Sequence, residues 1–131
     1  MEQPLPAILV VDDDDAVREL IATALIEADF DVTTAATGWD AVALVEEKRF
    51  DLIIADIRLP GDLDGLEMAR HARRRHPELK FLFISGKNRP VICDPRLDDF
   101  ISKPFLPSLL VGCVWKVLCG NQPYPRVEVA R

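Results

Sequence analysis

The segment Asp-Leu-Ile-Ile-Ala-Asp at residues 51–56 decides the fold of this chain. Its four central residues are all apolar, and short runs of this kind are typical of strands that are buried on both faces of a parallel sheet. Similar runs occupy residues 7–11, 81–84 and 100–101, and segments with helical spacing of apolar residues separate them. Alternating strands and helices predict a doubly wound α/β fold with right-handed crossovers.

The expected elements can be placed by their apolar patterns and turn signals. Strands are predicted at residues 7–11, 30–35, 52–56, 79–84 and 99–101, and helices at residues 15–28, 38–49, 66–76 and 107–118. Asp14 is the expected N-cap of the first helix. Its expected buried face is Val17, Leu20, Ile21, Ala24, Leu25 and Ala28. Pro90 and Pro95 make a regular helix of normal length unfavourable within residues 86–102, so we expect a loop or a broken turn there.

The totals describe one globular domain. The chain has 131 residues, 49% hydrophobic and 29% charged, with 22 acidic and 16 basic side chains that give a formal net charge of −6. This acidic balance disfavours direct nucleic-acid binding, which needs a basic surface. Three cysteines without metal-ligand spacing predict reduced thiols, and no signal peptide or membrane span is recognisable. We therefore expect a soluble cytoplasmic protein.

Polar residues follow the carboxyl ends of the predicted strands. Asp12 and Asp13 follow the first, Asp56 ends the third, Ser85 ends the fourth and Lys103 follows the fifth. Ligands of such sheets bind at these ends, so we expect the side chains to converge in one crevice. Clustered carboxylates need protons or a cation, and oxygen ligands suit Mg²⁺. A lysine and a hydroxyl beside them suit phosphoryl transfer to a carboxylate.

These residues carry a family resemblance over about residues 5–118. The motifs Val-Val-Asp-Asp-Asp at 10–14, Asp-Leu-Ile-Ile-Ala-Asp-Ile-Arg-Leu-Pro-Gly at 51–61, Asp64-Gly65, Phe-Ile-Ser-Gly at 83–86 and Lys-Pro-Phe at 103–105 resemble the receiver domain of two-component response regulators. The resemblance implies a flavodoxin-like, CheY-like sheet with strand order 2-1-3-4-5. Residues 1–119 would form the receiver domain and residues 120–131 a C-terminal tail.

The resemblance also implies a role for each site residue. Asp56 would be phosphorylated by a histidine kinase or a histidine phosphotransfer protein, and the domain would catalyse only its own phosphorylation and dephosphorylation. Mg²⁺ would be held by Asp12, Asp13, Asp56 and the backbone carbonyl of Arg58. Ser85 and Lys103 would contact the phosphoryl group, with Ser85 and Phe100 as the switch residues. Arg58 and Lys87 occupy positions where family members tune the access of water to the acyl phosphate.

Two other functions stay open. Asp12-x-Asp14, Ser85, Lys103 and the Asp98-Asp99 pair resemble scattered motifs of haloacid-dehalogenase-type phosphatases, in which Asp12 would be the nucleophile. The acidic pair precedes the lysine, however, and the chain is too short to supply a cap domain. The other alternative is a binding module that uses the same fold without being phosphorylated.

Two departures from the family pattern affect the surface. The turn at residues 60–65 has one residue more than the usual Pro-Gly-x-Asp-Gly, and only 17 residues separate Ser85 from Lys103. The short spacing predicts that the family's fourth helix is short or absent. In the last helix, Leu109, Leu110, Cys113, Val114 and Val117 form the expected sheet-facing stripe, which leaves Val111, Trp115 and Leu118 on another face. That second stripe is either covered internally or is a contact surface for a homodimer or a downstream protein. The Arg70–His76 cluster predicts a solvated helix face.

Overall fold

A computed structural model of the chain describes residues 4–86 and 94–120. Five parallel strands form one sheet in the order β2-β1-β3-β4-β5, as the sequence predicts. The strands are β1 (Ala7–Val11), β2 (Asp31–Ala35), β3 (Leu52–Asp56), β4 (Lys80–Ser85) and β5 (Asp98–Ser102). The helices are α1 (Asp15–Glu27), α2 (Gly38–Glu47), α3 (Gly65–Arg75) and α4 (Pro107–Cys119). No helix in the described parts of the chain is long and apolar enough to cross a membrane.

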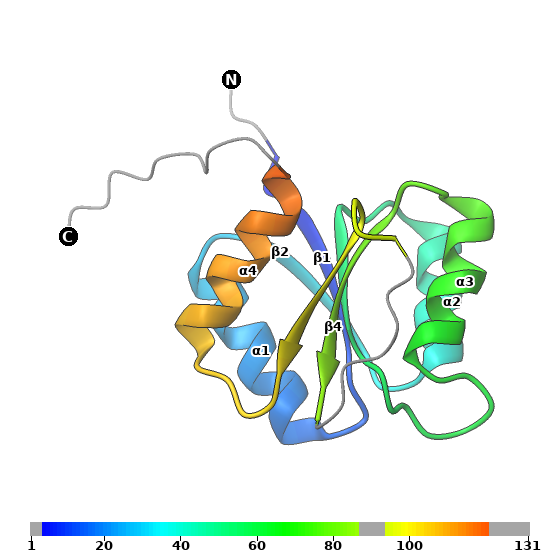
Figure 1. The fold of residues 1–131 in the computed structure, drawn as a ribbon, viewed down its shortest axis with the longest axis horizontal. Helices are drawn as coiled ribbons and strands as arrows, with labels where there is room; N and C mark the ends of the chain where they lie inside the picture. Colours follow the sequence, from blue (N-terminus) through cyan, green and yellow to red (C-terminus); the bar gives the residue numbers. More distant parts are fainter. Residues whose placement is uncertain (1–3, 87–93, 121–131) are drawn as a thin grey trace.

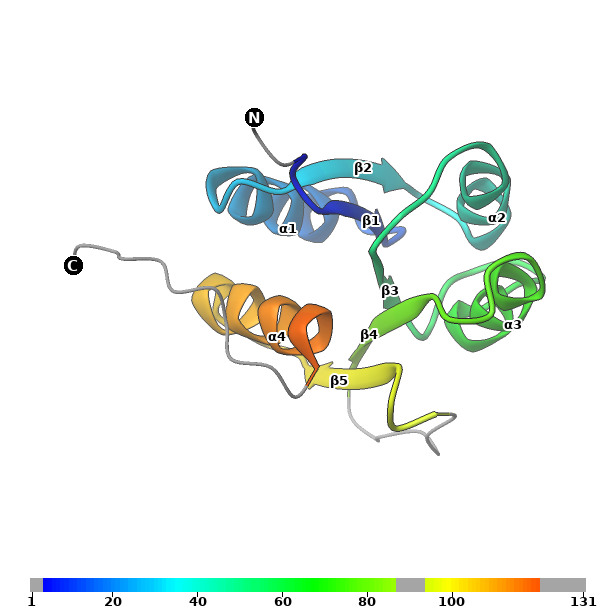
Figure 2. The same cartoon turned by 90° about the horizontal axis from the view of Figure 1, so that it is seen from above.

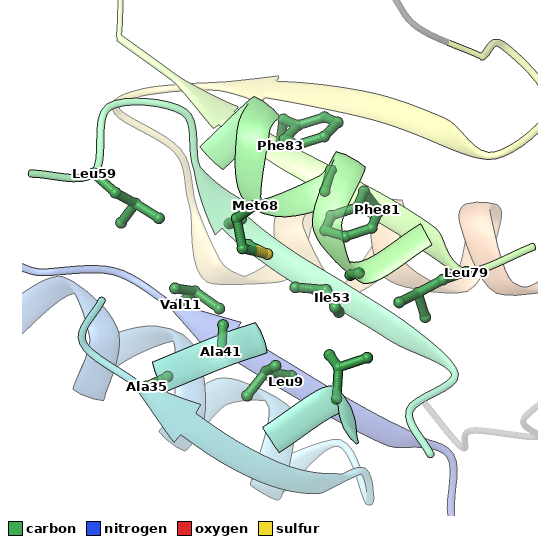
Figure 3. Packing of buried hydrophobic residues seen from close by; sticks show 14 of the residues in the cluster. Leu9, Val11, Ala35, Ala41, Ile53, Leu59, Met68, Leu79, Phe81 and Phe83 are labelled. Atoms are coloured by element: carbon green, nitrogen blue, oxygen red, sulfur yellow. The ribbon is translucent and has the colours of Figure 1, made fainter. Parts of the chain in front are cut away.

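The helices cover both faces of the sheet (Figures 1 and 2). Helices α1 and α4 lie on one face, and α2 and α3 lie side by side on the other. The central strands β1, β3 and β4 are largely apolar on both sides because each face meets a helix layer. Figure 3 shows the core beneath α2 and α3, where Leu9, Ile53, Met68, Phe81 and Phe83 are fully buried. The central strand β3 is therefore held between two cores.

Side-chain caps fix where three helices begin. Asp14 accepts hydrogen bonds from the backbone N–H groups of Ala16 and Val17, which confirms it as the N-cap of α1. Thr37 caps α2 and Asp64 caps α3 in the same way. Each cap satisfies backbone donors that have no partner inside the helix. The caps follow β1, β2 and β3, so they fix the helix starts beside the carboxyl ends of the strands.

Two predictions about buried helix faces were wrong. Leu20 is 48% exposed and Leu109 is 55% exposed, although both were assigned to buried stripes. Helices α1 and α4 share one sheet face and pack against each other. Each helix therefore covers only part of that face, and some of its apolar residues remain exposed. The predicted second stripe of α4 is packed internally: the Trp115 ring lies 4.9 Å from the Phe30 ring, and Val111 and Leu118 join the same core.

The segment between β4 and β5 carries no helix in its described residues, 86 and 94–97. Residues 87–93, which include Lys87 and Cys93, and the tail at residues 121–131 lie outside the described residues. Cys113 and Cys119 are free and partly buried, and burial raises the pKa of the Cys113 thiol.

A buried ion pair lies at the start of β5. The guanidinium of Arg73 in α3 donates to Asp98 at 2.5 and 3.4 Å and to the carbonyl of Leu79, and it lies 4.8 Å from the centre of the Phe81 ring. The prediction that Arg73 lies on the solvated face of α3 was therefore wrong.

Candidate functional site

The carboxyl ends of β1, β3, β4 and β5 meet at one edge of the sheet. Val11 pairs with Ala55, Asp56 with Ile84, and Ser85 with Ser102, so the residues that follow these positions are neighbours. Asp12 directly follows β1, and Lys103 directly follows β5. The backbone N–H of Lys103 donates to the carbonyl of Ser85 at 2.8 Å, which joins the last two strand ends. The convergence expected from the sequence is present.

Asp12 is the most deeply buried acid of the site, with no exposed area. Its Oδ1 accepts the backbone N–H of Asp14 at 2.9 Å, whereas its Oδ2 is buried without a hydrogen-bond partner among the described residues. Burial, and then the negative charges of Asp56 and Asp13, raise the pKa of Asp12 above its ordinary value. A buried oxygen without a donor is costly, so this atom is available to a cation or a proton.

Asp56 uses both carboxylate oxygens. Its Oδ1 accepts the backbone N–H of Arg58 at 2.9 Å, and its Oδ2 accepts Lys103 Nζ at 2.9 Å. Burial lowers the pKa of Lys103, but the hydrogen bond and the charge of Asp56, together with the charge of Asp12, outweigh that effect and raise it. The ammonium therefore remains charged at neutral pH. Its side chain is 35% exposed, so the pair opens to solvent on one side.

Three carboxylates form a cluster that could hold a cation. One oxygen each from Asp12, Asp13 and Asp56 lies within 4.8 Å of the others. Asp12 and Asp56 are buried, and Asp13 is exposed at the mouth of the cluster. Metal–oxygen distances of about 2.1 Å place the ligand oxygens of a small divalent ion about 3 to 4 Å apart. The oxygen set and the unpartnered Asp12 Oδ2 fit such an ion.

Ser85 ends β4 at the same edge of the sheet, and Phe100 lies in β5, two positions before that strand ends. Ser85 is buried at the end of β4. Phe100 is buried in β5, where its ring stacks on Phe83 at 5.5 Å between centroids, and Phe83 stacks on Phe81 at 5.3 Å. This row of aromatic rings runs along the sheet face from the site toward the Arg73–Asp98 pair. The sequence did not predict the row, because it depends on the register between β4 and β5.

The turn after β3 is attached closely to the Asp56 backbone. Gly65 donates its N–H to the carbonyl of Ile57, and a Cβ at position 65 would lie 2.4 Å from the carbonyl oxygen of Asp56. Only glycine allows this approach. The longer turn also buries Leu63 against the start of α2, where a Cβ at Gly38 would lie 2.7 Å from the Leu63 carbonyl oxygen. The turn therefore joins Asp56 to both α2 and α3.

The fold, the acid cluster and the Asp56–Lys103 pair together define a class of protein, and comparisons with known proteins identify the same class. The chain belongs to the response regulator receiver domain family, whose profile matches residues 8–114.

Individual relatives differ in how much of their length the chain spans. It is 36% identical over 115 residues to the response regulator receiver protein CpdR of Brucella abortus, covering 85% of this chain and 95% of that protein. It is 35% identical over 118 residues to the transcriptional regulatory protein AfsQ1 of Streptomyces coelicolor, covering 87% of this chain but only 52% of that protein. The crystal structure of a response regulator receiver protein from Sinorhizobium medicae superposes with a TM-score of 0.80 at 26% identity, covering 90% of this chain and 98% of that one.

Proposed function

We propose that this chain is a phosphoacceptor receiver domain, formed by residues 1–119, in which Asp56 takes a phosphoryl group from a histidine kinase or a histidine phosphotransfer protein. The observation that carries the proposal is the contact of Lys103 Nζ with Asp56 Oδ2 at 2.9 Å, beside two further carboxylates that could share a cation. A structural ion pair would not need the unpartnered oxygen of Asp12 next to it. Membership in the receiver family supports the same assignment.

The transfer step can be written with the groups at the site. One carboxylate oxygen of Asp56 forms a bond to phosphorus while the bond between phosphorus and the histidine nitrogen of the donor breaks. The imidazole leaves, and Asp56 becomes an acyl phosphate. Lys103 then places its positive charge beside a phosphoryl oxygen, and the Ser85 hydroxyl donates to another. In the dephosphorylation step, the oxygen of water forms a bond to phosphorus while the bond between phosphorus and the Asp56 oxygen breaks, and inorganic phosphate and the free carboxylate are released.

Mg²⁺ is the proposed cofactor. Asp12, Asp13 and Asp56 would hold it, together with the backbone carbonyl of Arg58. When bound, the ion supplies positive charge for the phosphoryl oxygens and offsets the repulsion among the acids, which is about 4 kcal/mol for two charges at 4 Å and an effective dielectric near 20. The backbone N–H of Arg58 also donates to Asp56 Oδ1 at 2.9 Å.

The proposed output is contact with other proteins in the cytoplasm, without direct binding to nucleic acid or membrane. Phe100, buried against Phe83 beside Ser85, is the proposed switch residue that reports the state of Asp56. A homodimer or downstream contact through the last helix would use the exposed Leu106 and Leu109, because Trp115 is packed on Phe30. The proposed catalytic activity is limited to the phosphorylation and dephosphorylation of Asp56 itself.

The test is labelling by a small phosphodonor. Acetyl phosphate or phosphoramidate should add one phosphoryl group, measured by intact mass or Phos-tag electrophoresis, only when Mg²⁺ is present. Asp56→Asn should abolish the label. The matched control is Asp62→Asn, which changes an exposed acid in the adjacent turn and should leave labelling intact.

Two results would contradict the proposal. A label that survives Asp56→Asn and maps to Asp12 would favour the phosphatase alternative, in which Asp12 is the nucleophile. The structure already separates the Asp98 part of that motif from Asp12, because Asp98 pairs with Phe81 at the opposite end of the sheet. A folded protein that binds Mg²⁺ but takes no label from either donor would instead favour the binding-module alternative.

A further inference from the structure

A groove between α2 and α3 lies outside the acid cluster. It has a volume of about 260 Å³ and is lined by residues of both helices and of the turn before α3. Figure 2 shows α2 and α3 side by side, and in Figure 1 the turn that leads into α3 lies at the lower end of these helices. Leu63 forms part of the groove and packs against the start of α2, so the turn that begins at Asp56 also forms one wall of the groove.

An exposed tryptophan stands at the edge of this groove. Trp39 is 51% exposed, and its ring meets the His71 ring edge-on at a centroid distance of 5.1 Å. Tryptophan and arginine are the side chains most enriched among residues that dominate binding energy at protein interfaces. The His71 contact orients the indole and leaves half of its surface for a partner.

Two arginines of α3 line the same groove. Arg70 and Arg74 are exposed, lie one helical turn apart, and make no hydrogen bond or ion pair through their side chains with any described residue. Arg73 of the same helix, by contrast, is fully engaged by Asp98 and Leu79. Two neighbouring cations that have no carboxylate of their own are complementary to acidic groups on another molecule.

The acidic residues of the groove distinguish between classes of partner. Asp62 and Glu67 lie toward the N-terminal end of α3, where a negative charge is favoured by the helix dipole. They would repel a phosphate backbone, and the net charge of −6 adds to that repulsion. A protein segment can avoid them, because it can place its carboxylates against Arg70 and Arg74 and an apolar side chain against Trp39.

We propose that this groove is a docking site for an acidic protein segment that carries an aromatic or large aliphatic residue. The apolar residue packs on Trp39, and carboxylates on the same segment pair with Arg70 and Arg74. The proposal does not depend on phosphorylation of Asp56. The shared turn places the docking site beside the phosphoacceptor.

The probe is a random-peptide display library panned against the whole folded chain. Enriched peptides, synthesised and titrated, should carry carboxylates around an aromatic or aliphatic residue. With 5-fluorotryptophan incorporated, ¹⁹F NMR should show the Trp39 signal shifting on binding, while the signal of Trp115, packed on Phe30, stays in place. The Arg70→Gln/Arg74→Gln double variant and Trp39→Ala should each lower affinity at least about tenfold. Arg75→Gln is the matched control, since this exposed arginine of the same helix does not line the groove.

Three results would overturn the proposal. The first is that panning enriches no acidic peptide. The second is that enriched peptides bind the double variant as well as the parent chain. The third is that a single-stranded oligonucleotide binds with dependence on Arg70 and Arg74 while no peptide does. Thermal unfolding of each variant shows whether a loss of affinity reflects a loss of fold, and unchanged stability with lost binding supports the site.

Discussion

Two ion pairs at opposite ends of the sheet differ in how completely their carboxylates are satisfied. At the start of β5, the fully buried Asp98 side chain receives two bonds from Arg73 and a third from the backbone N–H of Asp94. At the carboxyl ends of the strands, Asp56 is paired with a partly exposed lysine, and the neighbouring Asp12 has a buried oxygen without a partner in the described part of the chain. In the first arrangement, both carboxylate oxygens have donors. In the second, Asp12 Oδ2 is open to a cation or a proton.

The two ends of the sheet therefore differ in how their charged groups affect stability. A buried ion pair stabilises only when hydrogen bonds replace the water that its charges have lost, and Arg73–Asp98 meets that condition. The acid cluster does not, because Asp12 and Asp13 add negative charge without adding donors. This pattern is expected if the cluster is the functional site that we propose, because functional sites often give up local stability.

Breaking the Arg73–Asp98 pair should have the largest effect on stability. Asp98→Ala or Arg73→Met leaves a charge without its partner, and we expect the free energy of unfolding to fall by about 3–5 kcal/mol. The double variant Arg73→Met/Asp98→Leu removes both charges and should recover most of that loss. Urea denaturation measures all three. The control is Arg96→Ala, which breaks the exposed Arg96–Asp94 pair and should change stability little. Equal losses in the single and double variants would show that packing matters more than charge.

Binding of a cation to the acid cluster should stabilise the folded chain. Mg²⁺ at ten times its dissociation constant should raise the free energy of unfolding by about 1.4 kcal/mol, because it binds the folded cluster. Burial raises the pKa of Asp12 in the folded chain above its ordinary value of 3.8. The folded chain therefore loses stability as the pH rises from 3.8 through this higher pKa, because the buried carboxyl group must ionise. The stabilisation by Mg²⁺ should therefore be larger near pH 7 than at low pH.

Asp12→Asn tests the cause of that stabilisation. The amide oxygen can still accept the N–H of Asp14, but it carries no charge. The variant should be more stable than the parent chain without metal, and the increment from Mg²⁺ should largely disappear when thermal unfolding is followed. An unchanged increment would mean that the ion is bound elsewhere.

The sequence predicted the convergence of the site residues but not the Arg73–Asp98 pair, and the reason is physical. Parallel strands place their carboxyl ends at one edge, so the convergence of Asp12, Asp56, Ser85 and Lys103 follows from their positions after apolar runs. The strand order was predicted from the family resemblance, and the N-cap of α1 from the local sequence. The proposed role of each site residue stays a prediction until labelling is measured.

The contacts that the sequence did not predict depend on distant segments. Arg73 lies four residues after the buried Ala69, a spacing that puts it at the edge of the buried face of α3, but its partner Asp98 is 25 residues away. The packing of Trp115 on Phe30 likewise joins α4 to the end of α1. Apolar periodicity gives the direction of a face and not the neighbour that will cover it. The groove at Trp39 needed the structure for the same reason.

Removing the lysine of the Asp56–Lys103 pair should have the smallest effect on stability and a large effect on labelling. Because Lys103 is partly exposed, we expect Lys103→Met to change the free energy of unfolding by no more than about 1 kcal/mol. The rate of labelling by acetyl phosphate should fall by about 100-fold or more, since a charge aimed at the phosphoryl oxygens is lost. Arg73→Met should show the reverse pattern, with normal labelling for each folded molecule. If Lys103→Met instead destabilises the chain as strongly as Arg73→Met and leaves labelling intact, the Asp56–Lys103 pair holds the fold and the distinction between the two ends of the sheet fails.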